Sequence, residues 1–381
     1  MRYIRDLKHL PRLKIDPQDY AFVEETCRGL VEAARRRTPA GAPLFVTSDP
    51  GAEPACRLSN FGHLVEYAAA LLDPQELLGC LDLLLSTQGA DGQLPDRVSL
   101  AGEAVFLAGP ADAPLGEGPP LDTTPLLVKA LDAYYRLTAD VAGYLQRVPR
   151  LYAALEVVPL SADRLVYVDP NRPRPAHAWA DRVALTGNVL LPTLLYWEAA
   201  RRLAIRLQAL EEHEDARQWF EVEVATLRRL PDFRDPLTGL FWAASESGHR
   251  GDLWGSAYAA VIRRASKKQS RILGQWLLEH RGEVFHRGHL RALPPGEYWP
   301  RLLAPIPEGQ GPNGGYWAAP AGWALRTVAL VDADAARELA ADLLATWREG
   351  GVRAWINPAG EAGEPGCLTA AACLLGSLAP A

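Results

Sequence analysis

The stretch GPNGGYWAAPAGW, residues 311–323, lies between two segments with helical periodicity. It combines four glycines with three large aromatic residues, Tyr316, Trp317 and Trp323. Glycine lets a backbone approach a ligand closely, while Trp and Tyr offer flat faces with polar tips. Loops of this aromatic-rich kind recur along the chain and alternate with very short turns. We predict the fold from that alternation.

Helical periodicity dominates the rest of the chain, and strand-like alternation is scarce. Asp73, Asp252, Ser266 and either Asp332 or Asp334 are expected helix N-caps, and Pro192 fits a helix only in its first turn. The pattern predicts twelve helices, at about 17–37, 60–72, 74–88, 124–138, 140–157, 188–210, 214–230, 254–264, 266–281, 321–331, 334–349 and 367–378.

The connections after odd-numbered predicted helices are long, and those after even-numbered ones contain only a few residues. Antiparallel neighbours joined in this way place every long loop on one face and every short turn on the other. We therefore expect an all-α fold, an (α/α)6 toroid in which outer helices ring inner ones, as one domain over residues 1–381. An open α-solenoid is the alternative, but the loops differ widely and show no fixed repeat.

Composition narrows the function classes. The chain has 381 residues and a net charge of -6, which argues against a nucleic-acid partner. No apolar run reaches the length of a membrane span, and the start lacks a signal-peptide core, so we expect a cytoplasmic protein, with homo-oligomerisation left open. The eight His show no zinc pattern, and no metal or cofactor is expected. The five Cys are expected to be reduced core residues.

Polar and aromatic residues on the loop-rich face are the candidate functional residues. Aromatic planes beside carboxylates and amides suit a sugar ring, whose C–H faces stack and whose hydroxyls need hydrogen-bond partners. Glycoside cleavage also needs two carboxyl groups. The candidate catalytic residues are Asp181, Glu308 and Glu361, and the candidate substrate-binding residues are Asp122, Trp179, Arg182, Tyr298, Trp299, Asn313, Tyr316 and Trp317.

Each candidate also has a purely structural interpretation. Asp122 could support the turn before a helix, and Arg182 could serve as the ion-pair partner of Asp181. Tyr316 and Trp317 could fill the core of the toroid. Carboxylates in the Gly-rich loop near residue 361, including Glu364, could simply be solvated.

Several motifs together resemble the six-hairpin glycosidase superfamily of (α/α)6 barrels. They are QGADGQLPDRV, LDTTPLLVKALDAYY, WADRVALTGNVLLPTLLYWEAARRLA, GDLWGSAYA, GHLRALPPGEYWP, PNGGYWAAPAGWAL and INPAGEAGEPG. The resemblance covers most of the chain from about Asn60. It implies that Asp181, behind Trp179, is the general acid of an inverting enzyme.

The resemblance also implies a catalytic Glu a few residues before Asn357-Pro358, yet the chain has Ala354 there. The family's Arg-Asp pair before the second helix is likewise replaced by Arg57-Leu58-Ser59. We therefore expect an inverting glycoside hydrolase of a small oligosaccharide or glycoside, with Glu361, Glu364 or Glu308 as base. The alternatives are a non-catalytic carbohydrate-binding protein or, with less support, a sugar epimerase or a cyclase. An epimerase needs His as acid and base, and His286 and His289 are the only close His pair on this face. A cyclase needs an acidic cluster, and Asp332 and Asp334 are expected on the turn side instead.

Overall fold

The computed structural model describes residues 9–110 and 112–381. In this part of the chain every helix of more than one turn corresponds to one of the twelve predicted helices. The thirteenth, α10 (Arg281–Val284), is a single turn. The others are α1 (Pro17–Ala34), α2 (Leu58–Ala68), α3 (Pro74–Ser86), α4 (Thr123–Thr138), α5 (Val141–Glu156), α6 (Leu190–Ala209), α7 (His213–Arg229), α8 (Leu253–Val261), α9 (Lys267–Glu279), α11 (Ala321–Val328), α12 (Ala333–Gly350) and α13 (Leu368–Ser377).

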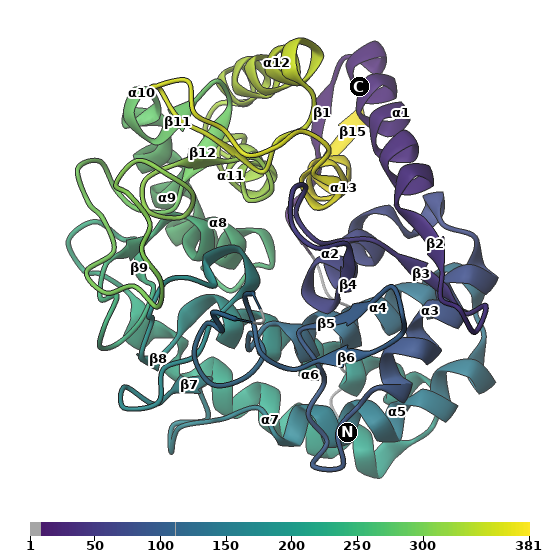
Figure 1. Cartoon of the computed structure of the whole chain (residues 1–381). Helices are drawn as coiled ribbons and strands as arrows, with labels where there is room; N and C mark the ends of the chain where they lie inside the picture. The colour runs from purple at the N-terminus through teal and green to yellow at the C-terminus, as the bar shows by residue number, and fades with distance from the viewer. Residues whose placement is uncertain (1–8, 111) are drawn as a thin grey trace.

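The twelve longer helices form an inner and an outer set. Each inner helix contacts the next in the order α2, α4, α6, α8, α11 and α13, and α13 contacts α2. Every residue of α8, α11 and α13 is buried, because these short helices consist mainly of small and apolar residues, with Arg326 of α11 as a buried exception. The outer helices α1, α3, α5, α7, α9 and α12 lie around them in Figure 1, and each buries mainly one face.

Glycine allows some of the inner helices to approach each other closely. A Cβ atom on Gly62 of α2 would lie 2.6 Å from Cβ of Leu126 on α4. On Gly322 of α11 it would lie 2.5 Å from Oγ of Ser377 on α13. Both distances are below any normal van der Waals contact, so a larger residue would push these helix pairs apart.

The helix termini confirm most of the capping predictions. The side chain of Asp73 accepts hydrogen bonds from Gln75 N and Glu76 N, and that of Ser266 accepts one from Gln269 N. Asp252 caps α8, and Asp332 rather than Asp334 caps α12. Each cap satisfies backbone N–H groups that have no partner within the helix.

The first helix ends earlier than predicted. Its run of arginines, Arg35–Arg37, leaves α1 and forms strand β2, which pairs antiparallel with β3 (Pro43–Phe45). Hydrophobic periodicity cannot detect this change, because the three arginines carry no apolar pattern. Pro149 lies inside α5, where the sequence analysis had placed no break.

Strands in the described residues are only two or three residues long, which explains why alternation was hard to see. They are β1 (Leu13–Ile15), β2, β3, β4 (Ala55–Arg57), β5 (Arg97–Ser99), β6 (Ala104–Val105), β7 (Tyr167–Val168), β8 (Gly187–Asn188), β9 (Phe241–Trp242), β10 (Gly251–Asp252), β11 (Phe285–His286), β12 (His289–Arg291), β13 (Tyr316–Trp317), β14 (Trp355–Ile356) and β15 (Leu378–Pro380). Two sheets matter for the site: β4-β5-β6 joins the loop before α2 to the loop before α4, and β11-β12-β13-β14 joins the two last long loops.

The core contains a buried ionic cluster between the inner helices. Glu198 of α6 accepts hydrogen bonds or ion pairs from Lys129 of α4 at 2.9 Å and from Arg202 at 2.7 Å. Glu198 is 0% exposed, so its charge depends on these partners. All five Cys are buried and free, as predicted.

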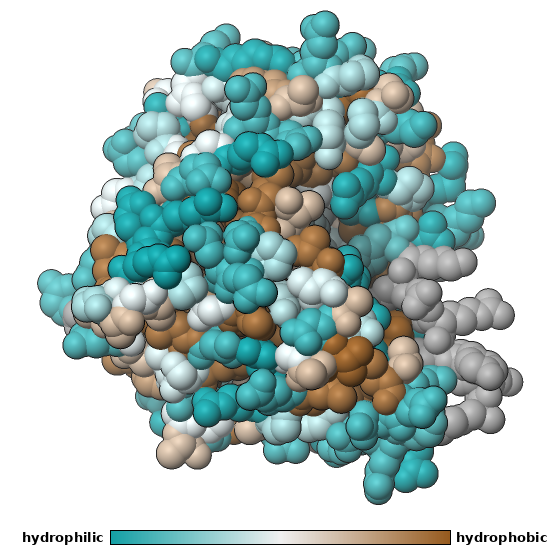
Figure 2. All heavy atoms as spheres, turned by 90° about the vertical axis from the view of Figure 1, so that its right-hand side faces the viewer, coloured by the Kyte–Doolittle hydropathy of each residue, from teal (hydrophilic) through white to brown (hydrophobic). Residues whose placement is uncertain are grey.

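One side of the molecule shows a mixture of hydrophobic and hydrophilic residues (Figure 2). Figure 2 shows the side that carries α1 and α3, where hydrophilic residues separate the hydrophobic areas from one another. None of the helices in the described ranges has the length and hydropathy that a membrane span requires.

Candidate functional site

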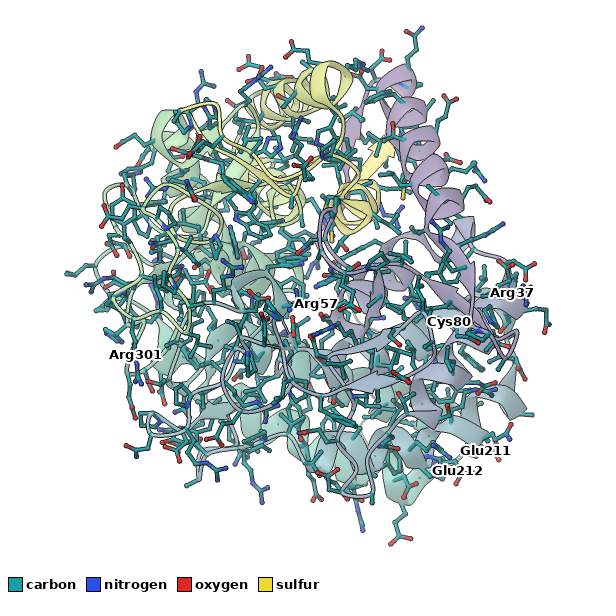
Figure 3. All side chains as sticks on the ribbon, viewed as in Figure 1. Arg37, Arg57, Cys80, Glu211, Glu212 and Arg301 are labelled. Atoms are coloured by element: carbon teal, nitrogen blue, oxygen red, sulfur yellow. The ribbon has the colours of Figure 1, made fainter. Side chains whose placement is uncertain are left out.

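Five of the long loops meet around one cavity of about 760 Å³. The loops are those after α1, α3, α5 and α12 together with the long connection from α9 to α11. The charged residues that line the cavity are Asp49, Glu53, Arg57, Asp96, Arg97, Asp112, Asp181, Arg182 and Glu364, and its aromatic residues are Trp179, Trp317 and Trp355. Figure 3 places Arg57 near the centre of the ring of helices, whereas Arg37 and Arg301 lie at its periphery.

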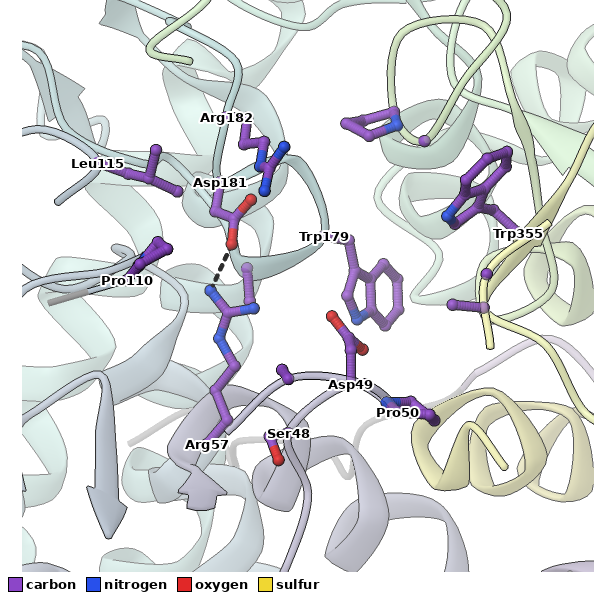
Figure 4. Close-up of a pocket in the computed structure, with 18 of the residues that line it drawn as sticks. Ser48, Asp49, Pro50, Arg57, Pro110, Leu115, Trp179, Asp181, Arg182 and Trp355 are labelled. Atoms are coloured by element: carbon purple, nitrogen blue, oxygen red, sulfur yellow. Dashed lines mark hydrogen bonds and ion pairs between the residues drawn. The ribbon is translucent and has the colours of Figure 1, made fainter. Parts of the chain in front are cut away.

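Arg57 organises the charges at one side of the cavity. Its Nη2 donates to Oδ2 of Asp181 at 2.8 Å (Figure 4). Its Nε donates to Oδ1 of Asp96 at 3.2 Å. Asp96 also accepts from Arg97 at 2.9 Å. Burial would lower the pKa of Arg57, but Asp96 and Asp181 together raise it, so Arg57 stays charged.

Strand pairing explains how Asp96 reaches Arg57. Arg57 ends β4 and directly precedes α2, while Arg97 begins β5, and the two residues are partners in the antiparallel register. Asp96 therefore lies beside the start of α2, where its backbone carbonyl also accepts from Leu58 N. The carboxylate that the resemblance expects next to Arg57 in sequence is thus supplied by a distant segment.

Asp49 contributes a second carboxyl group to the cavity. In Figure 4 its carboxyl group points toward Trp179, away from the contact between Arg57 and Asp181. Burial is the largest influence on Asp49 and raises its pKa, Arg57 lowers it, and Asp181 and Asp96 add to the rise. A carboxyl group in such surroundings holds a proton more readily than a solvated one.

The three tryptophans that line the cavity differ in how much of each ring is exposed. Trp179 is only 7% exposed and stacks on His63 of α2, with ring centroids 4.5 Å apart. Trp317 is also 7% exposed and packs edge-on against Trp254. Trp355 is half-buried, so it offers a ligand more of its ring than the other two.

The structure brings together four of the predicted site residues, namely Trp179, Asp181, Arg182 and Trp317. It also brings to the same cavity Arg97 and Glu364, of which the sequence analysis had offered Glu364 as a possible base. The predicted residues that do not line this cavity are Asp122, Tyr298, Trp299, Glu308, Asn313, Tyr316 and Glu361.

Three of the residues outside the cavity lining are held by backbone contacts in the long loop before α11. Asn313 Oδ1 accepts from Trp299 N at 3.0 Å, and Trp299 Nε1 donates to Pro312 O at 2.8 Å. Tyr316 lies on β13 and donates its hydroxyl hydrogen to Glu283 O at 2.9 Å. These contacts hold the loop that carries Trp317. Tyr316 points away from the cavity and Trp317 into it, because successive residues of a strand point to opposite sides.

Two of the candidate catalytic carboxylates also lie outside the lining. Glu361 accepts from Nδ2 of Asn357 at 2.7 Å and from Nε2 of Gln310 at 3.0 Å, so it ties the last loop to the preceding one. Glu308 is exposed. Glu364, three residues after Glu361 in the same loop, does line the cavity.

Asp122 does not line the cavity but lies against the segment that carries Trp179. Its side chain does not cap α4, and its Oδ2 accepts from Ala178 N at 3.1 Å, just before Trp179. Its Oδ1 is buried without a partner, and burial raises its pKa to about 7. Asp122 thus supports the segment that carries Trp179 and Asp181, a role between the two that the sequence suggested.

The features that would suit an epimerase or a cyclase lie elsewhere. His286 and His289 face each other across β11 and β12, outside the cavity lining, and His289 is fully buried. Asp332 is engaged as a helix cap. Within residues 9–110 and 112–381, no group of three or more His, Cys, Asp or Glu is placed to hold a metal ion.

Sequence reasoning missed Asp49, Asp96 and Trp355. Asp49 and Trp355 lie in segments rich in Pro, Gly and turn residues, where no periodicity distinguishes a cavity residue from a solvated one. Arg57 was noted as the family's position, but its partner was sought in the adjacent residues. The pairing of β4 with β5 supplies that partner through two strands too short to be recognised in the sequence.

Comparison with known proteins gives matches only at the level of structure. No protein-family profile and no curated protein sequence matches the chain. Among solved structures, a GH63 mannosylglycerate hydrolase from Thermus thermophilus in complex with glucose has a TM-score of 0.67 and 17% identity, covering 93% of this chain and 99% of that one. A rhamnosidase from Klebsiella oxytoca with rhamnose bound has a TM-score of 0.66 and 13% identity, covering 97% and 65%.

A glycosidase variant in complex with glucose is also similar, with a TM-score of 0.63 and 11% identity, covering 95% of this chain and 98% of that one. These identities are too low to carry an activity from one protein to another. The TM-scores and coverages do show a shared architecture over nearly the whole chain. The protein therefore shares its overall fold with these glycosidases, in line with the resemblance that its sequence motifs suggested.

Proposed function

We propose that the protein is a carbohydrate-active enzyme whose central cavity binds and hydrolyses a small oligosaccharide or glycoside with inversion. The observation that carries this proposal is the meeting of Asp181, Glu364 and the half-buried Trp355 at one cavity. Its volume of about 760 Å³ suits a small ligand. A carboxyl group on each side of a sugar and an aromatic plane against its C–H face are what glycoside hydrolysis requires.

In this proposal the fold is a closed (α/α)6 barrel formed by a single domain over residues 1–381. The contact of α13 with α2, which links the end of the inner series to its beginning, supports closure. Closure would also explain why loops from opposite ends of the chain, around Asp49 and Glu364, line the same cavity.

Asp181 is proposed as the general acid and Glu364 as the base that activates water. Asp181 holds the position that the resemblance assigns to the acid. Among the three candidate bases, Glu364 lines the cavity, whereas Glu361 is engaged by Asn357 and Glu308 is exposed outside the lining. An inverting pair stands roughly 6.5–9.5 Å apart, which leaves room for the water.

The ion pair between Arg57 and Asp181 favours a second candidate function. The guanidinium of Arg57 lies 2.8 Å from Oδ2 of Asp181 and so occupies a carboxyl oxygen from which a general acid would deliver its proton. Ala354 also stands where the resemblance expects the base. A protein that binds sugar in the same cavity without turnover would be consistent with both observations.

Turnover of defined substrates separates the two functions. The wild type and the Asp181→Asn and Glu364→Gln variants would be incubated with a panel of aryl and methyl glycosides, and the released anomer would be followed by proton NMR. If Asp181 and Glu364 are the acid and the base, each variant should lose at least about 10²-fold in the rate of hydrolysis. Glu25→Gln on the outer helix α1 should retain the wild-type rate.

Release of the inverted anomer by the wild type would support the proposed enzyme. Saturable binding with no product from any glycoside would instead identify a binding protein. Unchanged turnover in Asp181→Asn would show that the acid is misassigned, and Asp49 would then be tested in the same way, because its raised pKa suits a proton donor.

A further inference from the structure

The charges that line the cavity are unbalanced. Six carboxyl groups face it, from Asp49, Glu53, Asp96, Asp112, Asp181 and Glu364, against three guanidinium groups, from Arg57, Arg97 and Arg182. When all are ionised, the lining carries a net charge of -3. A cavity with low-dielectric walls concentrates such a field on whatever enters it.

Ion pairs within the lining engage most of its guanidinium groups but only some of its carboxyl groups. Arg57 is engaged by Asp96 and Asp181, and Arg97 by Asp96 and by the carbonyl oxygens of Leu107 and Gly109. Within the described ranges no hydrogen bond or ion pair reaches the side chains of Asp49, Glu53, Asp112 or Glu364, and Arg182 is the one guanidinium of the lining without a partner. Four carboxyl groups and a single guanidinium are therefore free to meet a ligand.

Three of these free carboxyl groups lie on one wall. A Cβ atom on Gly51 would lie 3.4 Å from Cγ of Glu364, and a Cβ on Gly366 would lie 3.8 Å from Pro50. The segments 49–53 and 363–366 are thus in contact, which places Asp49, Glu53 and Glu364 together. Figure 4 shows Arg182 beside Asp181, away from Asp49 and Pro50.

These carboxyl groups are too dispersed to form a metal site, since no described group of three or more acidic, His or Cys side chains could hold an ion. A dispersed acidic wall beside an aromatic ring suits a ligand that carries one positive charge among hydroxyl groups. A sugar ammonium group supplies that charge together with three hydrogen-bond donors. Resting on the proposed sugar site, we infer that the cavity prefers glycosides with a free amino group and disfavours glycosides with a carboxylate.

The inference can be tested by isothermal titration calorimetry with matched ligands. Each set contains a methyl hexoside, its 2-amino-2-deoxy form and its uronate, in the gluco and manno series. At low salt the amino form should bind about tenfold more tightly than the neutral form, the order expected for three unit charges roughly 10 Å away in water, and the uronate should bind most weakly. The difference should shrink in ~0.5 M NaCl.

Charge-removing variants locate the effect. Glu53→Gln and Glu364→Gln should each reduce the ratio of amino to neutral affinity by about twofold, because each removes about one third of the field. The exposed Glu25→Gln, which makes the same change on the outer helix α1, should leave the ratio unchanged.

The outcomes distinguish this inference from the function on which it rests. Saturable binding of the neutral sugars with equal or weaker binding of the amino forms would overturn the preference and leave the sugar site standing. Tightest binding of a uronate would also overturn it. Failure of every ligand to bind would count against the proposed sugar site itself, and with it against the inference.

Discussion

Asp122 should make the stability of the protein depend on pH in a way that its amide variant does not. The carboxyl group is buried beneath the segment that carries Trp179, and burial raises its pKa from 3.8 to about 7. Below pH ~4 it is protonated in both the folded and the unfolded state. As the pH rises toward 7, only the unfolded state ionises, so the free energy of unfolding falls.

The size of this effect follows from the displacement of the pKa. A difference of about 3 pH units corresponds to roughly 4 kcal/mol, all of it lost once the pH exceeds about 7. Asp122→Asn keeps an oxygen that can accept from Ala178 N but has no proton to lose. Its free energy of unfolding, relative to the wild type, should therefore rise by about 3 kcal/mol between pH 4.5 and pH 8, since the rest of the change lies below pH 4.5.

Urea denaturation of both proteins at several pH values measures the difference, with tryptophan fluorescence and circular dichroism as independent probes of a single transition. Asp252→Asn is a parallel case, because burial also raises the pKa of Asp252 to about 7 and Asn remains an effective cap for α8. Glu25→Gln, on the exposed side of α1, is the control. If Asp122→Asn and the wild type follow parallel curves from pH 4.5 to 8, the burial argument is refuted.

Three further changes test the core and the cavity. Glu198→Gln removes the anion that neutralises buried Lys129 and Arg202 and should lower the free energy of unfolding by about 3–5 kcal/mol in urea melts; a loss below 1 kcal/mol would show that the cluster is not held by charge. Burial lowers the pKa of His177 from 6.5 to about 3, so stability should fall as the pH drops below 6.5, and His177→Gln should flatten that decline in acid titrations; an unchanged acid limb would contradict it. Trp355→Ala should weaken sugar binding about tenfold by calorimetry with little change in the thermal midpoint, and unaltered affinity would remove Trp355 from the site.

The sequence was sufficient for the helices and their alternation. Long amphipathic periods, and caps such as Asp73 and Ser266, are local signals, and they survive in the structure because tertiary packing agrees with them. The exception is Arg35–Arg37, where such a local signal is missing. A run of identical charged residues contains no period, and its pairing partner, Pro43–Phe45, lies across a turn.

The cavity could be predicted only in part, because long loops place side chains through contacts that no local pattern encodes. Trp179 and Asp181 were recognisable since they adjoin each other in one motif. Tyr316 and Trp317 also adjoin each other, yet only Trp317 lines the cavity, because successive residues of β13 face opposite sides. Deciding between them requires the register of a two-residue strand.

The same reasoning explains why the charge of the site emerges only in three dimensions. Read along the chain, Arg57 has no carboxylate beside it, whereas Arg97 directly follows Asp96. In the folded protein Asp96 is buried between them, and both are neutralised within the protein. The carboxyl groups of Asp49 and Glu364, which come from loops more than three hundred residues apart, are left facing the ligand instead. Which charged groups are left to meet an entering molecule thus depends on which of them pair in the folded protein, whereas the net sign of the field follows from the numbers of carboxyl and guanidinium groups in the lining.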